Sequence, residues 1–409
     1  MKKGTQLWLE ALKEEGVDTI FGYPGGYVLD IFDELYKQND IRLILPRHEQ
    51  AAVHAADAYA RATGKVGVCV ATSGPGATNL VTGIANANYD SVPLVCFTGQ
   101  VPLDLIGNDA FQEVDFIGIT RSVCKYGVMV RDRKDLGRII KEAFYIARTG
   151  KPGPVVVDLP SNIMKEVMKD SYPAEVHIRG YKPNSDVHVG QLKRALKLLR
   201  DAERPLFLCG GGINIAHANQ AFRQLAEIVN IPIITTVMGK GAIPTNHPLY
   251  VGSMGMHGCY AANKAVSECD LLFSIGTRFN DRITGKISEF AKEAKIVHID
   301  IDTAAISRNI KVDVPVVGDA KLAIEKMLTM VKQSEKREWV AQVKKWKEEY
   351  PLGVKSGNCV NPQRIIESIN NIFDDFIAVT DVGQHQMWTT QFLELDNHKK
   401  LLTSGGLGA

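Results

Sequence analysis

A single glutamate near the start of the chain stands where a carboxylate can take part in chemistry. Glu49 follows the apolar run "RLILP" (42–46) and precedes a long alanine-rich segment with helical spacing. It is therefore expected at the junction of a strand and a helix. There a carboxylate can simply stabilise the start of the helix through the helix dipole. Alternatively, in a dry site that shifts its pKa, it can exchange a proton with a bound group.

Two glycine-rich turns follow other predicted strands of the same region. They are "GYPGG" (22–26) and "TSGPGATN" (72–79). Glycine allows the backbone to approach a ligand closely, and the helix that follows offers free N–H groups. Neither turn continues into Gly-Lys-Ser/Thr, so a P-loop is excluded. No Gly-x-Gly-x-x-Gly turn follows the first strand, which disfavours a nicotinamide dehydrogenase.

A second group of candidate binding residues lies in the middle of the chain. The turn "GGGIN" (210–214) resembles a dinucleotide-binding turn only loosely, and alone it is weak evidence. Asp300 and Asp302 end the strand pattern "VHIDID", at a position where carboxylates often meet ribose hydroxyls. These residues indicate a second binding edge.

The elements that must position these residues alternate between short apolar runs and helical patterns. Such alternation predicts an α/β fold with parallel sheets covered by helices on both faces. The carboxyl ends of parallel strands meet at one edge of a sheet, where open α/β sheets bind ligands. The predicted strands are 18–23, 41–46, 66–72, 92–99, 153–160, 204–212, 231–239, 270–279, 294–302 and 375–383.

The same patterns divide the chain into consecutive domains. Residues 1–168 form the first α/β domain, and the polar segment 169–189 is a linker. Residues 190–334 form a second α/β domain, and 335–360 a charged helical linker. Residues 361–409 start a third α/β domain that is incomplete.

Composition limits the classes of partner. The chain has 409 residues with 48 basic and 46 acidic side chains, a net charge of +2, which indicates neither a nucleic-acid nor a membrane partner. Its seven cysteines are scattered without a Cys-x-x-Cys pair, as in a reduced cytoplasmic protein without a zinc site. The N-terminal segment is an amphipathic helix rather than a signal peptide. We therefore expect a cytoplasmic protein.

Taken together, the motifs resemble those of the catalytic large subunits of acetohydroxyacid synthase (acetolactate synthase), in the thiamine-diphosphate-dependent decarboxylase superfamily. The resemblance covers the whole chain. It implies consecutive three-layer domains with parallel sheets: a pyrimidine-binding domain, a central FAD-binding domain and the start of a diphosphate-binding domain. The motifs that carry it are "FGYPGG", "RHEQAAVHAADAYARATGKVGVCVATSGPGATNL", "TGQVP", "DAFQE", "MGKGAIP", "GMHG", "GTRFNDRITGK" and "TDVGQHQMW".

The resemblance assigns a role to Glu49. The matching glutamate of the family hydrogen-bonds N1′ of the cofactor aminopyrimidine and favours the tautomer that removes the thiazolium proton. Such an enzyme decarboxylates pyruvate and transfers the two-carbon unit to pyruvate or 2-ketobutyrate, in the synthesis of branched-chain amino acids. The resemblance also places Gln112 beside the cofactor, Phe111 in the active-site wall, Tyr23 and Gly25 against the aminopyrimidine, and Gln384 and His385 near the diphosphate. A core histidine is the alternative for His385.

The resemblance further implies a structural FAD in the middle domain. Arg282 is also linked to the carboxylate of the second keto acid, and a guanidinium fork suits that role. The alternative for Arg282 is a surface ion pair with Asp281. The implied FAD residues are Lys151, Gly210, Gly211, Gly212, Thr236, Val237, Met238, Met254, Gly255, Met256, His257, Gly276, Arg278, Arg282, Asp300, Asp302 and Asp319.

This chain departs from the family pattern at several places. Asn280 stands where the family usually has Asp, Lys151 where it often has Arg, and Ser161 where it often has Lys. The Gly-Asp-Gly segment that holds Mg²⁺ and the diphosphate is not found, so no metal ligand is assigned. We therefore expect a C-terminally truncated chain that forms no acetolactate by itself, although FAD binding can survive.

The remaining expectations concern partners and rival functions. The resemblance implies a homodimer or homotetramer and a small regulatory subunit. One rival is a related enzyme, either the catabolic acetolactate synthase without FAD or a pyruvate oxidase, against which "RFNDRITG" and "GMHG" argue. The other rival is a non-catalytic FAD-binding fragment. A bound flavin would separate the FAD enzyme from the flavin-free one.

Overall fold

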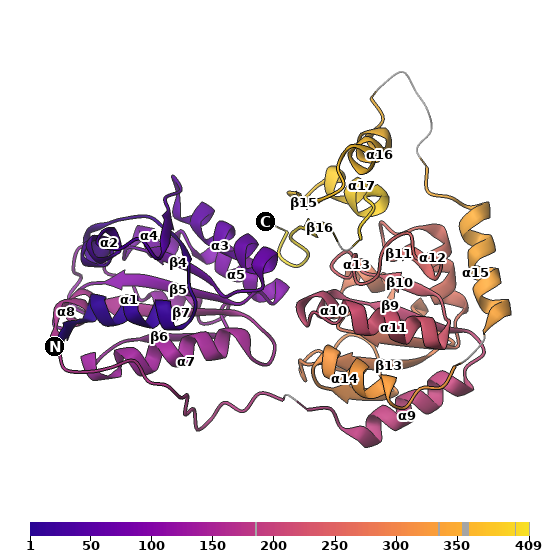
Figure 1. The fold of residues 1–409 in the computed structure, drawn as a ribbon, viewed down its shortest axis with the longest axis horizontal. Coiled ribbons are helices and arrows are strands. Elements are labelled where there is room, and N and C mark those ends of the chain that lie inside the picture. Colours follow the sequence, from indigo (N-terminus) through magenta and orange to yellow (C-terminus); the bar gives the residue numbers. More distant parts are fainter. Residues whose placement is uncertain (185, 334–335, 354–359, 397, 409) are drawn as a thin grey trace. The chain divides into compact units, whose positions relative to one another are not determined.

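The fold consists of two compact units, each built around its own parallel sheet (Figure 1). A computed structural model describes residues 1–184, 186–333, 336–353, 360–396 and 398–408. The first unit comprises residues 1–183 together with the residues from Ser404 onward, and the second comprises residues 184–403. Within the described residues no helix is both long and apolar enough to cross a membrane.

The first unit contains a six-stranded sheet in the order β3-β2-β4-β5-β7-β6, and every neighbouring pair is parallel. The predicted α/β class is confirmed, and each of the five predicted strands of this region is present. The strands are β2 (Thr19–Gly22), β3 (Arg42–Ile44), β4 (Gly67–Ala71), β5 (Leu94–Gln100), β6 (Tyr126–Met129) and β7 (Pro154–Pro160), with a separate antiparallel pair β1 (Lys2–Lys3) and β8 (Val167–Met168).

Helices cover both faces of this sheet because its central strands are apolar on both sides. Val68 and Val70 pack into one core with helices α1, α2 and α7. Cys69 and Ala71 pack into the opposite core with helices α3 and α5. The helices are α1 (Gly4–Glu14), η1 (Gly26–Val28), α2 (Leu29–Tyr36), α3 (Glu49–Thr63), α4 (Pro75–Thr78), α5 (Val81–Asp90), α6 (Phe116–Thr120), η2 (Arg133–Asp135), α7 (Leu136–Arg148) and α8 (Ser161–Lys165).

The second unit contains another parallel sheet of six strands, in the order β11-β10-β9-β12-β13-β14. The four predicted strands of this region form its centre. The strands are β9 (Pro205–Cys209), β10 (Ile233–Thr235), β11 (Tyr250–Ser253), β12 (Leu271–Ile275), β13 (Lys295–Asp300) and β14 (Val314–Val317).

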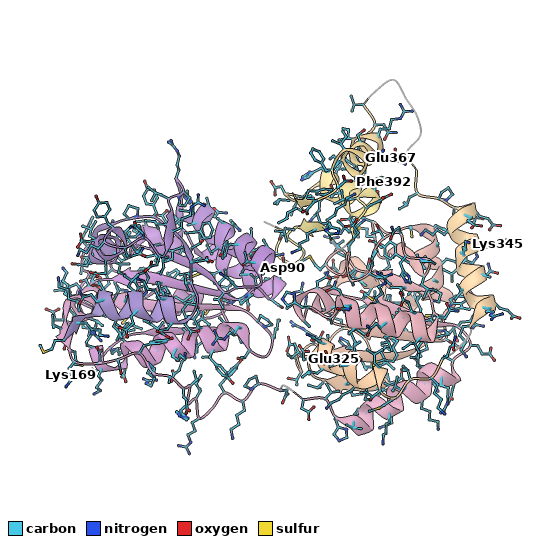
Figure 2. The ribbon with its side chains drawn as sticks, in the orientation of Figure 1. Asp90, Lys169, Glu325, Lys345, Glu367 and Phe392 are labelled. Atoms are coloured by element: carbon cyan, nitrogen blue, oxygen red, sulfur yellow. The ribbon has the colours of Figure 1, made fainter. Side chains whose placement is uncertain are left out.

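The helices of the second unit also divide between two faces. Helices α9, α11 and α14 pack on one face of the sheet, and helices α12 and α15 pack on the other. Glu325 and Lys345 lie on the exposed sides of two of them (Figure 2). The helices are α9 (Val189–Asp201), α10 (Gly211–Ile215), α11 (Asn219–Val229), α12 (Tyr260–Glu268), α13 (Asp281–Thr284), η3 (Ile287–Glu289), α14 (Ala320–Leu328) and α15 (Arg337–Glu349).

The last part of the second unit is the beginning of a third α/β arrangement. It has the parallel pair β15 (Phe376–Val379) and β16 (Lys399–Leu402), with α16 (Pro362–Ile372) and α17 (Gln384–Phe392). No described residue of α16 is buried, and Ile372 and Val379 are largely exposed. The segment is therefore incomplete, as the sequence predicts.

The predicted linker 169–189 has two different parts. From Lys169 to His188 the described residues form no helix or strand, and α9 starts at Val189. The first part nevertheless packs on the first unit, because the Tyr172 hydroxyl donates to Glu15 at 2.9 Å and the Tyr181 hydroxyl to the Thr149 carbonyl at 2.8 Å. The division into domains at the predicted limits stays a prediction.

The cysteines are thiols, as expected. Six lie in the described part of the chain, each is free, and five of them are buried. Cys359 lies outside the described residues.

Candidate active site

Glu49 lies at the predicted junction of strand and helix. Strand β3 ends at Ile44 and helix α3 begins at Glu49, after His48, whose ring accepts a hydrogen bond from the Gln50 N–H at 3.1 Å. The Asn79 side-chain amide donates to Glu49 Oε2 at 3.0 Å. This bond fixes the carboxylate from the end of α4, the short helix that follows β4. The side chain is half-buried, so the dry surroundings expected for it are incomplete, because the first turn of α3 lies at the rim of the sheet.

The second glycine-rich turn passes directly beside this carboxylate. A Cβ atom at Gly76 would lie 2.7 Å from Thr72 Cγ2 and 3.3 Å from Glu49 Oε1. No side chain fits at 2.7 Å, so the turn requires glycine in order to pass so close. The first turn meets the same threonine, because the Tyr27 N–H donates to Thr72 Oγ1 at 3.3 Å. Thr72 thus joins both turns next to Glu49.

The loop after β5 brings Phe111 and Gln112 to the same edge. Gln112 has a positive φ of 62°, a backbone conformation that costs about 1 kcal/mol or more and gathers at functional sites. Its carbonyl oxygen lies 2.9 Å from where a Cβ atom at Gly74 would be. Phe111 is 79 % exposed, and its carbonyl accepts from the Tyr27 hydroxyl at 3.2 Å. Tyr23 and Gly25 follow β2 at this edge, and the Tyr23 N–H donates to the Val70 carbonyl at 3.0 Å.

A buried carboxylate supports this loop from inside the sheet. Asp158, fully buried on β7, accepts from the Thr98 hydroxyl at 2.7 Å and from the Gln100 amide at 3.0 Å. The same Gln100 amide donates to the Val114 carbonyl at 2.9 Å, two residues beyond Gln112. Burial raises the pKa of Asp158 to about 7, despite the two hydrogen bonds, which lower it. Sequence analysis missed this residue, although an aspartate inside the apolar run "PVVVDLP" is a visible signal.

The candidate flavin residues of the second unit lie at the carboxyl ends of its six parallel strands. Each strand ends at or just before at least one candidate flavin residue, so the candidates lie along one edge of the sheet. In strand order they are Met254, Gly255, Met256 and His257 after β11; Thr236, Val237 and Met238 after β10; Gly210, Gly211 and Gly212 after β9; Gly276 and Arg278 after β12; Asp300 and Asp302 at β13; and Asp319 after β14.

Two of the glycine turns on this edge touch each other. Gly276 has a φ of +64°, and a Cβ atom at Gly210 would lie 2.0 Å from the Gly276 carbonyl oxygen. The Gly212 N–H donates to the same oxygen at 3.0 Å. Only glycine fits such a contact between backbones. The start of α10 is therefore held directly over the end of β12.

The acidic candidates differ in their surroundings. Asp300 Oδ1 accepts from the Asp302 N–H at 2.8 Å, and its other oxygen lies 3.6 Å from Nε2 of the buried His298. Asp319, by contrast, is the N-cap of α14, because its Oδ1 accepts from the Leu322 N–H at 3.0 Å. Its carboxylate thus has a structural role that the sequence did not predict.

Arg282 lies at the surface beside the "GMHG" turn. Its carbonyl accepts from the Met256 N–H at 2.9 Å, and its guanidinium lies 3.8 Å from both the Met256 sulfur and the Asp281 carboxylate. The ion pair with Asp281 exists, but the two side chains are 65 % and 77 % exposed, and such pairs contribute at most about 1 kcal/mol. The guanidinium therefore stays accessible to a carboxylate.

Three candidates lie apart from these groups. Lys151 lies before β7 in the first unit, whereas the other flavin candidates belong to the second. Gln384 and His385 begin α17, where both are exposed, so His385 is not part of a core in this structure. Within the described ranges, no cluster of three His, Cys, Asp or Glu side chains is arranged to hold a metal ion.

Comparison with known families gives matches in both units. The family described as "Thiamine pyrophosphate enzyme, N-terminal TPP binding domain" matches residues 2–119. The one described as "Thiamine pyrophosphate enzyme, central domain" matches residues 192–327. The first match contains Glu49, Gln112 and both glycine-rich turns, and the second contains the six strand ends described above.

Curated relatives match almost the whole chain. A "Probable acetolactate synthase large subunit" of Methanocaldococcus jannaschii is 46 % identical over 99 % of this chain and 71 % of the relative. An "Acetolactate synthase" of Mycobacterium bovis is 45 % identical over 99 % of this chain and 67 % of the relative. An "Acetolactate synthase large subunit" of Buchnera aphidicola subsp. Schizaphis graminum is 44 % identical over 99 % and 72 %.

Proposed function

Because this chain belongs to the family of acetolactate synthase large subunits, we propose that it decarboxylates pyruvate and transfers the two-carbon unit to a second 2-keto acid. The observation that carries this proposal is the carboxylate of Glu49, oriented by Asn79 and placed so close to the second glycine-rich turn that a Cβ atom at Gly76 would lie 3.3 Å from it. Pyruvate and 2-ketobutyrate are the proposed acceptors. The products would enter the synthesis of branched-chain amino acids.

The residues around Glu49 fit thiamine diphosphate. When bound, this cofactor supplies the electron sink that a 2-keto acid needs in order to lose carbon dioxide. Glu49 Oε2 already accepts from Asn79, and Oε1 faces the turn at Gly76, where no side chain blocks a ring nitrogen. We propose that Glu49 exchanges a proton with the pyrimidine ring. Tyr23, Gly25, Gln112 and Phe111 would form its walls, and Gln384 and His385 would lie near the diphosphate.

The strand ends of the second unit fit FAD. The backbone contact between Gly210 and Gly276 leaves the start of α10 open to an extended cofactor, and Asp300 and Asp302 offer carboxylates suited to ribose hydroxyls. We propose that these residues and the other flavin candidates of this edge bind FAD as a structural cofactor. Asp319 fits less well because its carboxylate caps α14, and Lys151 belongs to the other unit. Mg²⁺ is proposed as the partner of the diphosphate, with no ligand assigned.

We also propose that two copies of the chain form each active site. Glu49 is half-buried and Phe111 largely exposed, so one copy leaves the site open on one side. A second copy would exclude water, as this chemistry requires. A homodimer or homotetramer with a small regulatory subunit, located in the cytoplasm, is the proposed assembly.

An acetolactate assay on a complete enzyme that contains this sequence tests the proposed function. With thiamine diphosphate, Mg²⁺ and FAD present, pyruvate should be consumed and acetolactate formed, and the purified protein should show flavin absorbance. Product without flavin would instead indicate the flavin-free catabolic enzyme. Flavin binding without any product would indicate a non-catalytic FAD protein.

Arg282 gives a specific prediction about the second substrate. We expect Arg282→Lys to lower the rate of the second half-reaction, or the preference for 2-ketobutyrate, roughly tenfold, because an ammonium cannot replace a bidentate fork on a carboxylate. Decarboxylation of the first pyruvate should persist. The measurement is the ratio of the two products from mixed keto acids, together with carbon dioxide release. Arg308→Lys, an exposed arginine of the same unit, is the control. If the rates of both half-reactions fall equally and bound flavin is lost, Arg282 binds only the flavin.

A further inference from the structure

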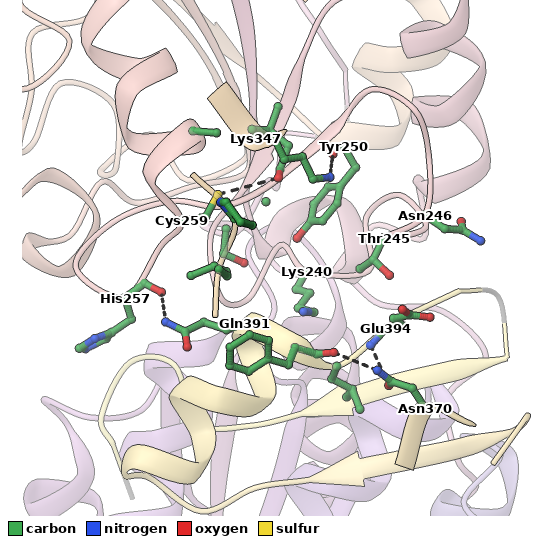
Figure 3. A pocket seen from close by; sticks show the side chains of 18 of the residues that line it. Lys240, Thr245, Asn246, Tyr250, His257, Cys259, Lys347, Asn370, Gln391 and Glu394 are labelled. Carbon is green, nitrogen blue, oxygen red and sulfur yellow. Dashed lines mark hydrogen bonds between the residues drawn. The ribbon is translucent and has the colours of Figure 1, made fainter. Parts of the chain in front are cut away.

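The second unit contains a pocket that the proposed chemistry does not use. It has a volume of about 350 Å³ and lies between the end of β11, helix α15 and the segment that carries α16 and α17 (Figure 3). Pockets of this size hold small molecules. Of the residues assigned above, only His257 lines it.

The deepest charged group of this pocket is an ammonium. Lys240, in the motif "MGKGAIP", is 6 % exposed, and its Nζ donates to the Thr390 carbonyl. Among the described residues no carboxylate forms an ion pair with it. Glu394 attracts it only from a distance. A buried charge without a counter-ion is costly in free energy, and burial lowers the pKa of Lys240 to about 7.

A second ammonium lines the same pocket. Lys347, on α15, is an exposed residue, but its Nζ donates to the Tyr250 carbonyl at 2.7 Å and lies 5.7 Å from the centre of the Tyr250 ring. It too forms no ion pair with a carboxylate in the described part of the chain, and burial lowers its pKa. An ammonium has three N–H donors. The hydrogen bond of each lysine to a carbonyl uses one donor, so both lysines keep donors for a ligand.

The buried charge of the pocket is cationic. Lys240 is buried, whereas Glu367, Glu394 and Lys347 are exposed residues. The other ionisable groups that line the pocket are His257, Tyr250, Cys259 and Tyr350. The pocket is thus positive at its buried end and has charges of both signs nearer to solvent.

We propose that this pocket binds a small anion through a carboxylate or phosphate group, with Lys240 as the buried anchor and Lys347 as the second cation. An anion on Lys240 supplies the missing counter-ion and stabilises the charged form of the amine. Binding is therefore coupled to proton uptake by Lys240 near neutral pH. This site lies apart from Glu49 and shares only His257 with the flavin edge, so anion binding by the two lysines can be tested separately from the proposed function.

The test is calorimetric titration of the full chain with inorganic phosphate and, separately, with pyruvate. We expect at least one of the two to bind, and Lys240→Met to weaken that binding roughly tenfold, the loss expected for a charge-assisted hydrogen bond. Titration in buffers of different ionisation enthalpy at pH 7.5 should show proton uptake with the original chain and none with Lys240→Met. Comparison of the two anions distinguishes a carboxylate site from a phosphate site.

Matched variants locate the binding. Lys347→Met should weaken it as well, whereas Lys344→Met, an exposed lysine on the same helix, should not. Lys240→Arg keeps the charge and should restore part of the binding without proton uptake. Absence of binding by both anions, or binding unchanged in both Lys240→Met and Lys347→Met, would show that the buried lysine is simply neutral and overturn the proposal. If Lys240→Met does not fold, the proposal is tested by the loss of anion binding in Lys347→Met and by the absence of proton uptake in Lys240→Arg.

Discussion

Replacing Glu49 by glutamine should reduce acetolactate formation by the ~10²–10⁴-fold that lost proton transfer typically costs. Glutamine keeps the size of the side chain, and its carbonyl oxygen can still accept from Asn79, as Glu49 Oε2 does at 3.0 Å. The amide cannot accept a proton at ordinary pH, so only the proposed chemical role is removed. The measurement is kcat for pyruvate conversion in a complete enzyme that contains this sequence and is saturated with thiamine diphosphate.

Two controls separate chemistry from folding in this experiment. Glu14→Gln, an exposed glutamate on α1, should leave the rate unchanged. Flavin content should be the same in both variants, because Glu49 lies in the other unit from the flavin edge. Near-normal turnover of Glu49→Gln would mean that the carboxylate only stabilises the start of α3, the alternative that the sequence leaves open.

The position of Glu49 was predictable because its signals are local. The apolar run before it, the helical spacing after it and the glycines of the two turns are each properties of a few neighbouring residues. Parallel strands then bring their carboxyl ends together without further information. The contact of Gly76 with Glu49, between residues 27 positions apart, follows from that arrangement.

Elements with weak local patterns were missed. Strand β6 is a half-exposed edge strand with a glycine, and β11 and β14 are short edge strands of four residues each. Edge strands have fewer neighbours to bury them, so their sequences carry less of the apolar signal that reveals a central strand. Strand β16, "KKLL", is formed only by its pairing with β15.

Side-chain roles that depend on distant partners were also missed. The family resemblance implies a flavin role for Asp319, which stays a prediction, but it does not indicate that the Asp319 carboxylate accepts from the Leu322 N–H of the following helix. Thr72 links the two turns and Asn79 orients Glu49, and neither residue type signals such a role by itself. Asp158 meets partners about sixty positions earlier in the chain, on the neighbouring strand.

Asp158 gives the second large expected effect, a stability that depends on pH. Burial raises the pKa of Asp158 from 3.8 to about 7, and nearby Asp115 raises it further, while hydrogen bonds from Thr98 and Gln100 lower it. Below pH 3.8 the carboxyl group is protonated in both folded and unfolded chains and has no cost. As pH rises from there to about 7 the unfolded chain loses the proton first, so the free energy of unfolding falls. Above pH 7 the ionised, buried Asp158 lowers the free energy of unfolding by its full amount, at most roughly 4 kcal/mol.

Asp158→Asn should therefore raise the unfolding midpoint of the first unit at pH 8, with a much smaller change at pH 4. The amide avoids the buried charge but keeps both contacts, since its oxygen can accept from Gln100 and its nitrogen can donate to Thr98 Oγ1. Asp158→Leu is the matched control. It leaves the Thr98 hydroxyl and one of the two N–H groups of the Gln100 amide buried without a partner, at about 1–3 kcal/mol each, so it should destabilise the unit at both pH values. It should also loosen the loop held through Val114, which proteolysis near Gln112 would report. Thermal unfolding of the three proteins at the two pH values tests this, because an equal midpoint shift of Asp158→Asn at pH 4 and pH 8 would mean that the pKa of Asp158 is the same in the folded and unfolded chains.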